Sequence, residues 1–321
     1  MARRAVDTIK ICFYIAKEGG CASEDAAALC SSDEGRRKMM KDLIRGAIDL
    51  HIHTSPDVVK RKCDDLELAE RLLAAGMGGC LIKNHYLDTA ARAKMVQKLY
   101  PQLRMEGGIA LNRSVGGLNP YAIERSAQAG GHFMWFPTLE ARAYFAITHK
   151  ESTPEEQETY IPVCGADGEL LPEAEAVLDA CEAYKMIVGT GHISAKEGMK
   201  VVEGAIRRGL QPVLTHCDNP NDCYTIEEQK KAAGMGAVIE HSYFTVYHNR
   251  VTIEEIAEQI RAVGCEHVIL DTDAGQLNSP YSDEGLAEFA EKLIGVGFTG
   301  DEIRRMICDN PRKLLDGEKL S

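Results

Sequence analysis

The sequence predicts an α/β protein built as a (β/α)8 barrel, or TIM barrel. From residue 46 onward, short apolar runs alternate with amphipathic helical windows, and this alternation occurs eight times. Strands that alternate with helices form parallel βαβ units, and eight such units are the number that closes a barrel. The alternative is an open doubly wound sheet with two extra strands. No GxGxxG turn follows the first apolar run, which weighs against the nucleotide-binding version of that sheet.

The expected strands are short and mostly apolar. They cover residues 47–53, 80–84, 105–111, 133–136, 186–190, 212–215, 237–240 and 267–270. The expected helices cover residues 64–76, 88–100, 120–129, a segment that starts near 172, 195–208, 225–233, 252–263 and 283–294. Acidic residues near the helix starts and Gly or Asn near the helix ends are typical of helix capping.

Two segments lie outside the eight-fold pattern. Residues 1–45 have helical patterning interrupted at Gly19-Gly20, and they form an N-terminal helical extension to the barrel of residues 46–321. This extension is expected to cover one end of the barrel or to contribute to a homo-oligomer interface. Residues 138–171 form a long insertion after the fourth strand, with a hairpin expected around Asp167-Gly168. Long loops on the functional side of a barrel commonly act as lids or pocket walls.

The composition limits the classes of partner. With 37 basic and 49 acidic residues the net charge is −12, which argues against nucleic-acid or anionic-membrane binding, since both need basic surfaces. No apolar run approaches transmembrane length. The eleven cysteines include no CxxC pair, which fits reduced thiols in the cytoplasm. The expected partner is therefore a small-molecule substrate.

Histidines gather at the ends of the expected strands. His51 and His53 end the first strand and share one face of it, so they can bind one divalent metal ion; taken alone, the pair could equally be two exposed or packed side chains. The strand-end set is His51, His53, His85, His192, His216 and His241. Asp271 ends the eighth strand. Because these strand ends meet at the rim where barrel active sites form, the set favours a metal site.

The ordered set of motifs resembles the amidohydrolase superfamily of metal-dependent hydrolases. The matching features are the HxH at 51–53, His192 and His216 ending the fifth and sixth strands, Asp271, and the Asn-Pro-x-x-Leu-Leu segment at 310–315. The resemblance extends from residue 46 to residue 316. Within the superfamily, the Asp-x-His-x-His-x-x-Pro-Asp segment at 49–57 is most similar to an uncharacterised branch. That branch implies the fold and a metal but no particular substrate.

The resemblance implies a role for each matching residue. His51, His53 and Asp271 would hold one metal ion, while His192 and His216 would hold a second ion or orient the substrate. Asp271 would also accept a proton from metal-activated water. A divalent metal lowers the pKa of bound water from near 16 to about 7, and a nearby carboxylate can then take the proton. Imidazole and carboxylate ligands suit zinc, with manganese, iron or nickel as alternatives.

One feature departs from the superfamily pattern. Many members bridge two metal ions with a carboxylated lysine or a glutamate at the end of the fourth strand, but no lysine lies there in this sequence and Glu140 is the nearest acid. On the second strand, Lys83 and His85 share one face. Lys83 could bridge two metals, hold a substrate anion or lie on the rim. The number of metal ions, one or two, therefore stays open.

Four more polar residues follow the expected strands. They are Asn112, Arg113, His241 and Asp273, and each could bind substrate or only support the site. Arg113 would suit a carboxylate or phosphate group. Cys217 alternates to the face opposite His216, where packing is the expected role.

The sequence thus favours a metal-dependent hydrolase that acts on an amide, cyclic amide or ester of a small molecule. A metal-dependent phosphoesterase on a similar barrel is the first alternative. A non-hydrolytic barrel, such as a decarboxylase-type lyase or a ligand-binding protein, is the second. The substrate is set by rim loops whose shapes the sequence does not define.

Overall fold

A single parallel sheet forms the centre of the molecule. The structure is a computed structural model that describes residues 39–220 and 222–320. Eight strands follow one another in sequential order, β1 next to β2 through to β8. Their bounds are β1 Ile48–Ile52, β2 Gly79–Ile82, β3 Arg104–Ala110, β4 Phe133–Trp135, β5 Ile187–Gly189, β6 Pro212–Leu214, β7 Val238–Ser242 and β8 Val268–Asp271. All seven neighbouring pairs are parallel, as the βαβ pattern predicts.

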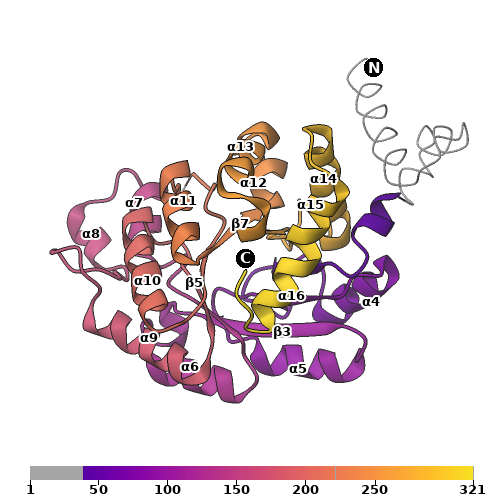
Figure 1. Cartoon of the computed structure of the whole chain (residues 1–321). Helices are drawn as coiled ribbons and strands as arrows, with labels where there is room; N and C mark the ends of the chain where they lie inside the picture. The colour runs from indigo at the N-terminus through magenta and orange to yellow at the C-terminus, as the bar shows by residue number, and fades with distance from the viewer. Residues whose placement is uncertain (1–38, 221, 321) are drawn as a thin grey trace, which may run out of the picture.

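The first and last strands also meet. Ile52 and Ala274 form a parallel bridge, and the His53 N–H donates to the Ala274 carbonyl at 2.8 Å. The sheet is therefore nearly closed, with helices packed around its outside (Figure 1). The predicted (β/α)8 barrel is confirmed, and every predicted strand is present to within a few residues.

Helices alternate with the strands along the chain, and α14 to α16 follow β8. Their bounds are α4 Asp65–Ala75, α5 Ala90–Leu99, α6 Pro120–Gln128, α7 Arg142–Thr148, α8 Pro154–Glu158, α9 Pro172–Tyr184, α10 Ala195–Arg207, α11 Ile226–Met235, α12 Tyr243–Tyr247, α13 Ile253–Val263, α14 Ser282–Gly295, α15 Gly300–Arg304 and α16 Asn310–Leu315, with the short turns η1 Arg113–Val115, η2 Cys265–His267 and η3 Arg305–Asp309. Helix α4 shows how the sequence sets such bounds. Asp64 accepts hydrogen bonds from the first free N–H groups, and Gly76 ends the helix in the left-handed conformation with φ 76°.

The predicted N-terminal extension lies almost entirely outside the described residues. Its predicted bounds are residues 1–45, and the structure describes only residues 39–45 of these. Residues 39–43 are helical. The division into residues 1–45 and 46–321 remains a prediction. In the described ranges no helix has the length and apolar character that a membrane span requires.

The insertion after β4 has secondary structure of its own. It carries the short helices α7 and α8, and its Phe145 and Tyr160 rings stack with centroids 3.7 Å apart. Cys164 and Leu170 form an antiparallel bridge across Gly168, which has φ 80°. The hairpin predicted at this position is confirmed.

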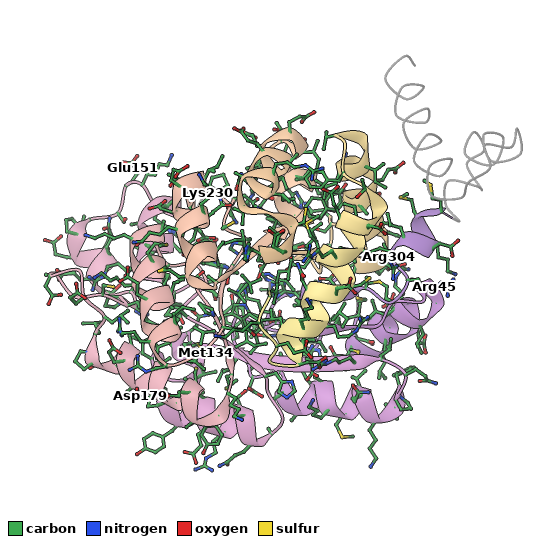
Figure 2. The ribbon with its side chains drawn as sticks, in the orientation of Figure 1. Arg45, Met134, Glu151, Asp179, Lys230 and Arg304 are labelled. Carbon is green, nitrogen blue, oxygen red and sulfur yellow. The ribbon has the colours of Figure 1, made fainter. Side chains whose placement is uncertain are left out.

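Alternation along the strands separates the inside of the barrel from its outside. An apolar cluster inside the barrel contains Ile269 of β8, whereas the neighbouring Leu270 packs outside the sheet against the helices. Figure 2 shows the buried Met134 in the interior of the molecule and the exposed Glu151 and Lys230 at its surface. The inner cluster also contains Trp135, which fills the floor beneath the strand ends.

A glycine makes room for this floor. A Cβ atom at Gly189 would lie 2.5 Å from the Trp135 ring, so only glycine on β5 leaves space for the indole. Phe133 stacks on Trp135 with ring centroids 4.3 Å apart. The polar groups of the strand ends therefore sit on a dry aromatic layer.

Candidate active site

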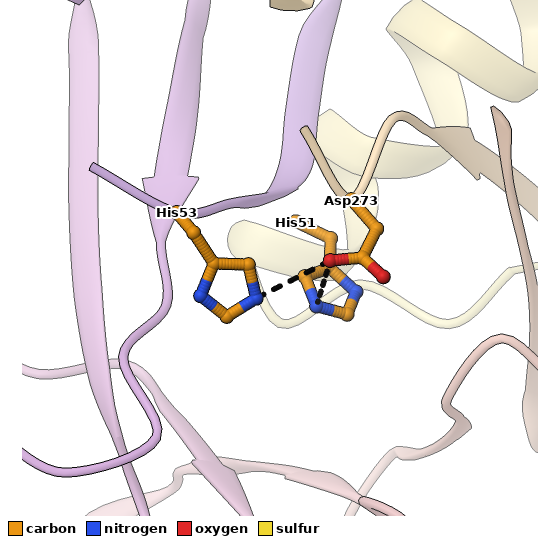
Figure 3. Close-up of side chains that lie close together, drawn as sticks. All are labelled: His51, His53 and Asp273. Atoms are coloured by element: carbon orange, nitrogen blue, oxygen red, sulfur yellow. Dashed lines mark ion pairs between the residues drawn. The ribbon is translucent and has the colours of Figure 1, made fainter. Parts of the chain in front are cut away.

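Two histidines and one aspartate converge at the ends of β1 and β8. His51 Nε2 lies 3.3 Å and His53 Nε2 lies 3.2 Å from the same Asp273 oxygen, Oδ1 (Figure 3). The three ligand atoms all lie within 4.8 Å of one another, and all three residues are buried. The sequence prediction that His51 and His53 share one face is confirmed by this geometry.

The backbone brings the two strand ends together. The β1–β2 register shifts between Asp49 and Ile52, which turns His51 inward. Asp273 has φ 47°, a left-handed conformation that is unusual outside glycine and directs its carboxylate back toward β1. Gly275 permits the close approach, since a Cβ there would lie 2.0 Å from the His53 carbonyl oxygen.

The protonation pattern of these residues fits a cation. His51 Nδ1 lies 2.9 Å from Glu240 Oε1 in hydrogen-bond geometry, which favours the tautomer with the proton on Nδ1 and the lone pair on Nε2. His51 Nε2 is buried and has no hydrogen-bond donor opposite it among residues 39–220 and 222–320. Burial lowers the pKa of both His51 and His53, which keeps the rings neutral. Two neutral imidazoles against a carboxylate are a ligand set for a divalent metal ion.

The other strand-end histidines extend this group into a cluster of rings. His53 stacks on His85 with ring centroids 4.6 Å apart, and His192 lies 5.5 Å from His85 and 4.9 Å from His216. The His216 ring in turn stacks on His51 at 5.7 Å. Five of the six predicted histidines are thus brought together.

His216 differs from its neighbours in charge. Its Nδ1 lies 2.7 Å from Asp222 Oδ2, and both side chains are buried. Burial acts to lower the pKa of His216, but the Asp222 carboxylate outweighs it and raises the pKa above its ordinary value. By contrast, burial and the neighbouring cations lower the pKa of His85 and His192. His216 also has φ 27°, so its backbone is held in an unfavourable conformation at the site.

The structure differs from the sequence prediction at His241. Strand β7 extends to Ser242, so His241 lies within the strand and points to the outer face. There its Nδ1 lies 2.9 Å from Asp218 Oδ1 and 4.0 Å from Cys217 Sγ. The second oxygen of Asp218 accepts from Thr245 at 2.6 Å. His241 is therefore part of the packing between strand and helices and does not join the ring cluster.

Asp271 ends β8 and Asp273 lies two residues beyond the strand. The resemblance implies Asp271 as the metal ligand. Asp273, two residues further along the chain, is the aspartate that meets both His51 and His53. Asp271 lies with His51 and Glu240 in a second buried group whose possible ligand atoms are all within 4.8 Å of one another. Asp271 accepts from Ser242 Oγ at 2.6 Å, and burial together with the charges of Glu240 and Asp49 raises its pKa well above the ordinary value. Burial would also raise the pKa of Asp273, but the nearby His51, His216 and Lys83 lower it.

Lys83 lies beneath the histidines. Its side chain is fully buried, with Nζ 5.2 Å from the centre of the Trp135 ring and no hydrogen-bond acceptor in the described part of the chain. Burial lowers the pKa of Lys83, and the carboxylates of Asp273 and Glu240 oppose this shift. A buried amine without a hydrogen-bond partner in the described part of the chain is available to a ligand.

Three other predicted residues lie at the rim and are paired with protein groups. Glu140 accepts from the backbone N–H of Arg113 at 2.6 Å, and Arg113 is exposed. Asn112 donates to the His85 carbonyl at 2.7 Å and accepts from the Thr138 N–H at 3.0 Å, so it joins the loops after β2, β3 and β4. The structure does not bring Glu140 or Asn112 into the ring cluster.

Sequence reasoning missed several residues of the site. Glu240 is the main one, and the alternation of β7 could have placed it on the inner face. Asp222 and Arg61 lie in loops, where no periodicity applies; Arg61 pairs with Asp57 at 2.5 Å and lies 3.4 Å from His53 Nδ1. Tyr144 of the insertion helix α7 packs on His192 with ring centroids 5.1 Å apart.

Comparison with solved structures supports the fold assignment. One similar structure is described as a candidate 2-pyrone-4,6-dicarboxylic acid hydrolase from Pseudomonas putida (17% identity, 85% of this chain and 98% of that chain, TM-score 0.58). Another is an amidohydrolase from Pseudomonas aeruginosa (14% identity, 88% and 98%, TM-score 0.52). A third is 2,6-dihydroxybenzoate decarboxylase in complex with 2,6-dihydroxybenzoate (13% identity, 85% and 99%, TM-score 0.51). The chain therefore has the fold of the amidohydrolase superfamily.

Comparison by sequence gives a family but no activity. No curated protein matches the chain. A family model described as a family of unknown function, DUF6282, matches residues 46–240, which is more than half of the chain and includes β1 to β6 and most of β7. The chain belongs to this family, DUF6282, on an amidohydrolase-type barrel.

Proposed function

We propose that the protein is a metal-dependent hydrolase that acts on an amide, cyclic amide or ester of a small molecule. The observation that carries the proposal is the convergence of His51 Nε2, His53 Nε2 and Asp273 Oδ1 on one buried point. A divalent ion held there would polarise a substrate carbonyl group and activate water for its attack. Zinc is the proposed ion because it suits imidazole and carboxylate ligands.

Each aspartate has a distinct proposed role. Asp273 is ionised at neutral pH because His51, His216 and Lys83 outweigh its burial, so it can hold the cation and accept a proton. Burial raises the pKa of Asp271 well above its ordinary value, which favours its neutral form, and Asp271 is proposed to support the floor of the site through Ser242. The catalytic and metal-binding role that the resemblance gives to Asp271 is therefore proposed for Asp273.

The remaining ring cluster is proposed to serve the substrate or a second ion. His192 Nδ1 and Lys83 Nζ are both buried, and neither has a hydrogen-bond partner among the described residues. His216, paired with Asp222, is suited to hydrogen-bond a substrate oxygen. His85 and Tyr144 would then form the wall of the pocket.

A lyase is the second candidate. A decarboxylase has the same fold, and the same residues could bind a substrate carboxylate next to a metal ion. A phosphoesterase is less favoured because the cations near the rim are already engaged: Arg61 with Asp57, and Arg113 with Glu140 and Tyr160.

Metal analysis tests the proposal directly. The purified protein is reconstituted with zinc and compared with His53→Ala, Asp273→Asn and Asp271→Asn, with the exposed His149→Ala as control. We expect bound zinc in the parent and in His149→Ala, strong loss in His53→Ala and Asp273→Asn, and retention in Asp271→Asn. Loss in Asp271→Asn alone would return the ligand role to Asp271. A parent that binds no zinc, manganese, iron or nickel would overturn the proposal.

Activity assays separate the reaction classes. N-acyl amino acids, lactones and cyclic amides are tested beside p-nitrophenyl phosphates and aromatic carboxylic acids. Hydrolysis of the first group that is lost in Asp273→Asn supports the hydrolase. Release of carbon dioxide from an aromatic acid would identify the lyase instead.

A further inference from the structure

One oxygen of Glu240 contacts two parts of the candidate metal site. Glu240 Oε1 lies 2.9 Å from His51 Nδ1, in hydrogen-bond geometry, and accepts from the backbone N–H of His216 at 3.1 Å. Glu240 is almost fully buried, so water does not compete for these hydrogen bonds. A single carboxylate on β7 thereby joins the ends of β1 and β6.

The contact with His216 occurs where the backbone leaves the sheet. The regular β6–β7 pairing ends at Leu214 and Ile239, and His216 then turns with φ 27°. The Glu240 carbonyl accepts from the Cys217 N–H at 3.2 Å, while the Glu240 side chain accepts from the His216 N–H. Both N–H groups of the turn are therefore satisfied by one residue, which holds the His216 ring over the site.

A carboxylate oxygen lies near each ring nitrogen of His51. Glu240 Oε1 meets Nδ1 in hydrogen-bond geometry at 2.9 Å, whereas Asp273 Oδ1 lies 3.3 Å from Nε2 without forming a hydrogen bond, so the geometry favours the proton on Nδ1 and the lone pair on Nε2. A carboxylate behind an imidazole fixes the orientation of the ring and makes it a stronger ligand.

We propose that Glu240 is a positioning residue for the metal centre: through one oxygen it holds His51 with Nδ1 protonated and Nε2 free, and it holds the turn that aims His216 into the site. The expected effect on metal binding rests on the proposed function. The two contacts of Glu240 do not, because they are made in the metal-free protein. Glu240 contacts His51 at Nδ1, whereas Asp273 faces His51 at Nε2.

The same strand offers a matched control. Asp218 also binds a buried histidine Nδ1 at 2.9 Å, but that histidine is His241, on the opposite face of β7. Asp218→Asn therefore removes a charge from an equally buried carboxylate–histidine pair that does not face the site. Any loss of metal affinity that is due only to general destabilisation should be similar in Asp218→Asn and Glu240→Gln.

The first measurement uses the metal-free parent protein. Nitrogen-15 NMR of the histidine rings at pH 8 reports which ring nitrogen is protonated, and the His51 signal is identified by its disappearance in His51→Asn. We expect His51 to be protonated at Nδ1. A ring protonated at Nε2 would overturn the proposal, whether or not the protein binds metal.

The second measurement compares cobalt(II) affinity, by competition with a chelator, in the parent, Glu240→Gln and Asp218→Asn. We expect Glu240→Gln to weaken binding about 10- to 100-fold and Asp218→Asn to leave it unchanged. Equal weakening in both variants, or no change in Glu240→Gln, would overturn the positioning role. If the parent binds no cobalt, the proposed function fails, and the ring-protonation result alone decides what Glu240 does.

Discussion

Asp49 and Thr272 connect the two strands that carry the candidate metal ligands. Asp49 Oδ1 accepts from the Thr272 N–H at 3.1 Å, and Asp49 Oδ2 accepts from the Thr272 hydroxyl at 2.5 Å. Asp49 also accepts from the His51 N–H at 3.2 Å and from Ser282 Oγ at 2.6 Å. Thr272 immediately precedes Asp273, so this one buried carboxylate fixes the spacing between His51 and Asp273.

We expect Asp49→Ala to destabilise the protein by about 2–4 kcal/mol, because it leaves several buried donors without an acceptor. It should also weaken metal binding, since His51 and Asp273 lose their common support. Urea unfolding and metal content check both effects, with the exposed Glu254→Ala as control. An Asp49→Ala variant as stable as Glu254→Ala would contradict this role.

Lys83→Met should make the fold more stable. Burial lowers the pKa of Lys83, which means that the folded protein disfavours its charge, and Met fills a similar volume without a charge. We expect a gain of about 1–3 kcal/mol in urea unfolding at pH 7 together with reduced metal content or activity. The exposed Lys98→Met is the control and should change stability little. A destabilised Lys83→Met would mean that the surrounding carboxylates need this charge for folding.

Glu106 lies at the end of the barrel opposite the candidate site. It should make the free energy of unfolding depend on pH. Its oxygens lie 2.9 Å from Lys94 Nζ, 2.9 Å from His132 Nδ1 and 3.0 Å from Arg104 Nε. Burial acts to raise the pKa of Glu106, but His132 and Lys94 lower it from 4.5 to about 2. Because the folded pKa is the lower one, the ionised form contributes stability above pH 4.5, and this contribution is lost as the pH falls toward 2.

We therefore expect Glu106→Gln to cost about 2–3 kcal/mol at pH 7 and progressively less between pH 4.5 and pH 2. Denaturant unfolding of the parent and the variant at pH 7, 5 and 3 measures the difference. A cost that stays constant across these values would show that packing, and not charge, explains the effect.

Tyr144 should contribute to the turnover of substrate and not to the stability of the fold. It lies on helix α7 of the insertion, is partly exposed, and packs on the His192 ring at 5.1 Å. We expect Tyr144→Ala to retain the melting temperature and metal content of the parent while kcat/KM falls about tenfold on the substrate that the activity panel identifies. The neighbouring Ile147→Ala, which is exposed on the same helix, is the control. Equal kinetics in the two variants would exclude Tyr144 from the pocket.

The sequence alone determined the architecture and the end of the barrel at which the candidate site lies. Apolar runs of strand length, helix caps such as Asp64 and Gly76, and the Asp-Gly hairpin are local features, so their bounds follow from neighbouring residues. The position of each histidine at a strand end is also local. For this reason the barrel, the insertion and five of the clustered histidines could be predicted before any distance was known.

Only the tertiary structure decided which carboxylates meet which histidines. Asp271 and Asp273 share a face of the chain, and the left-handed turn at Asp273 together with the close approach at Gly275 places the second of them against both His51 and His53. His241 faces outward because β7 is longer than its apolar run indicates. The His51–Glu240 contact joins positions 189 residues apart. Such pairings depend on how the barrel closes and on its strand register, and no local pattern in the chain encodes either.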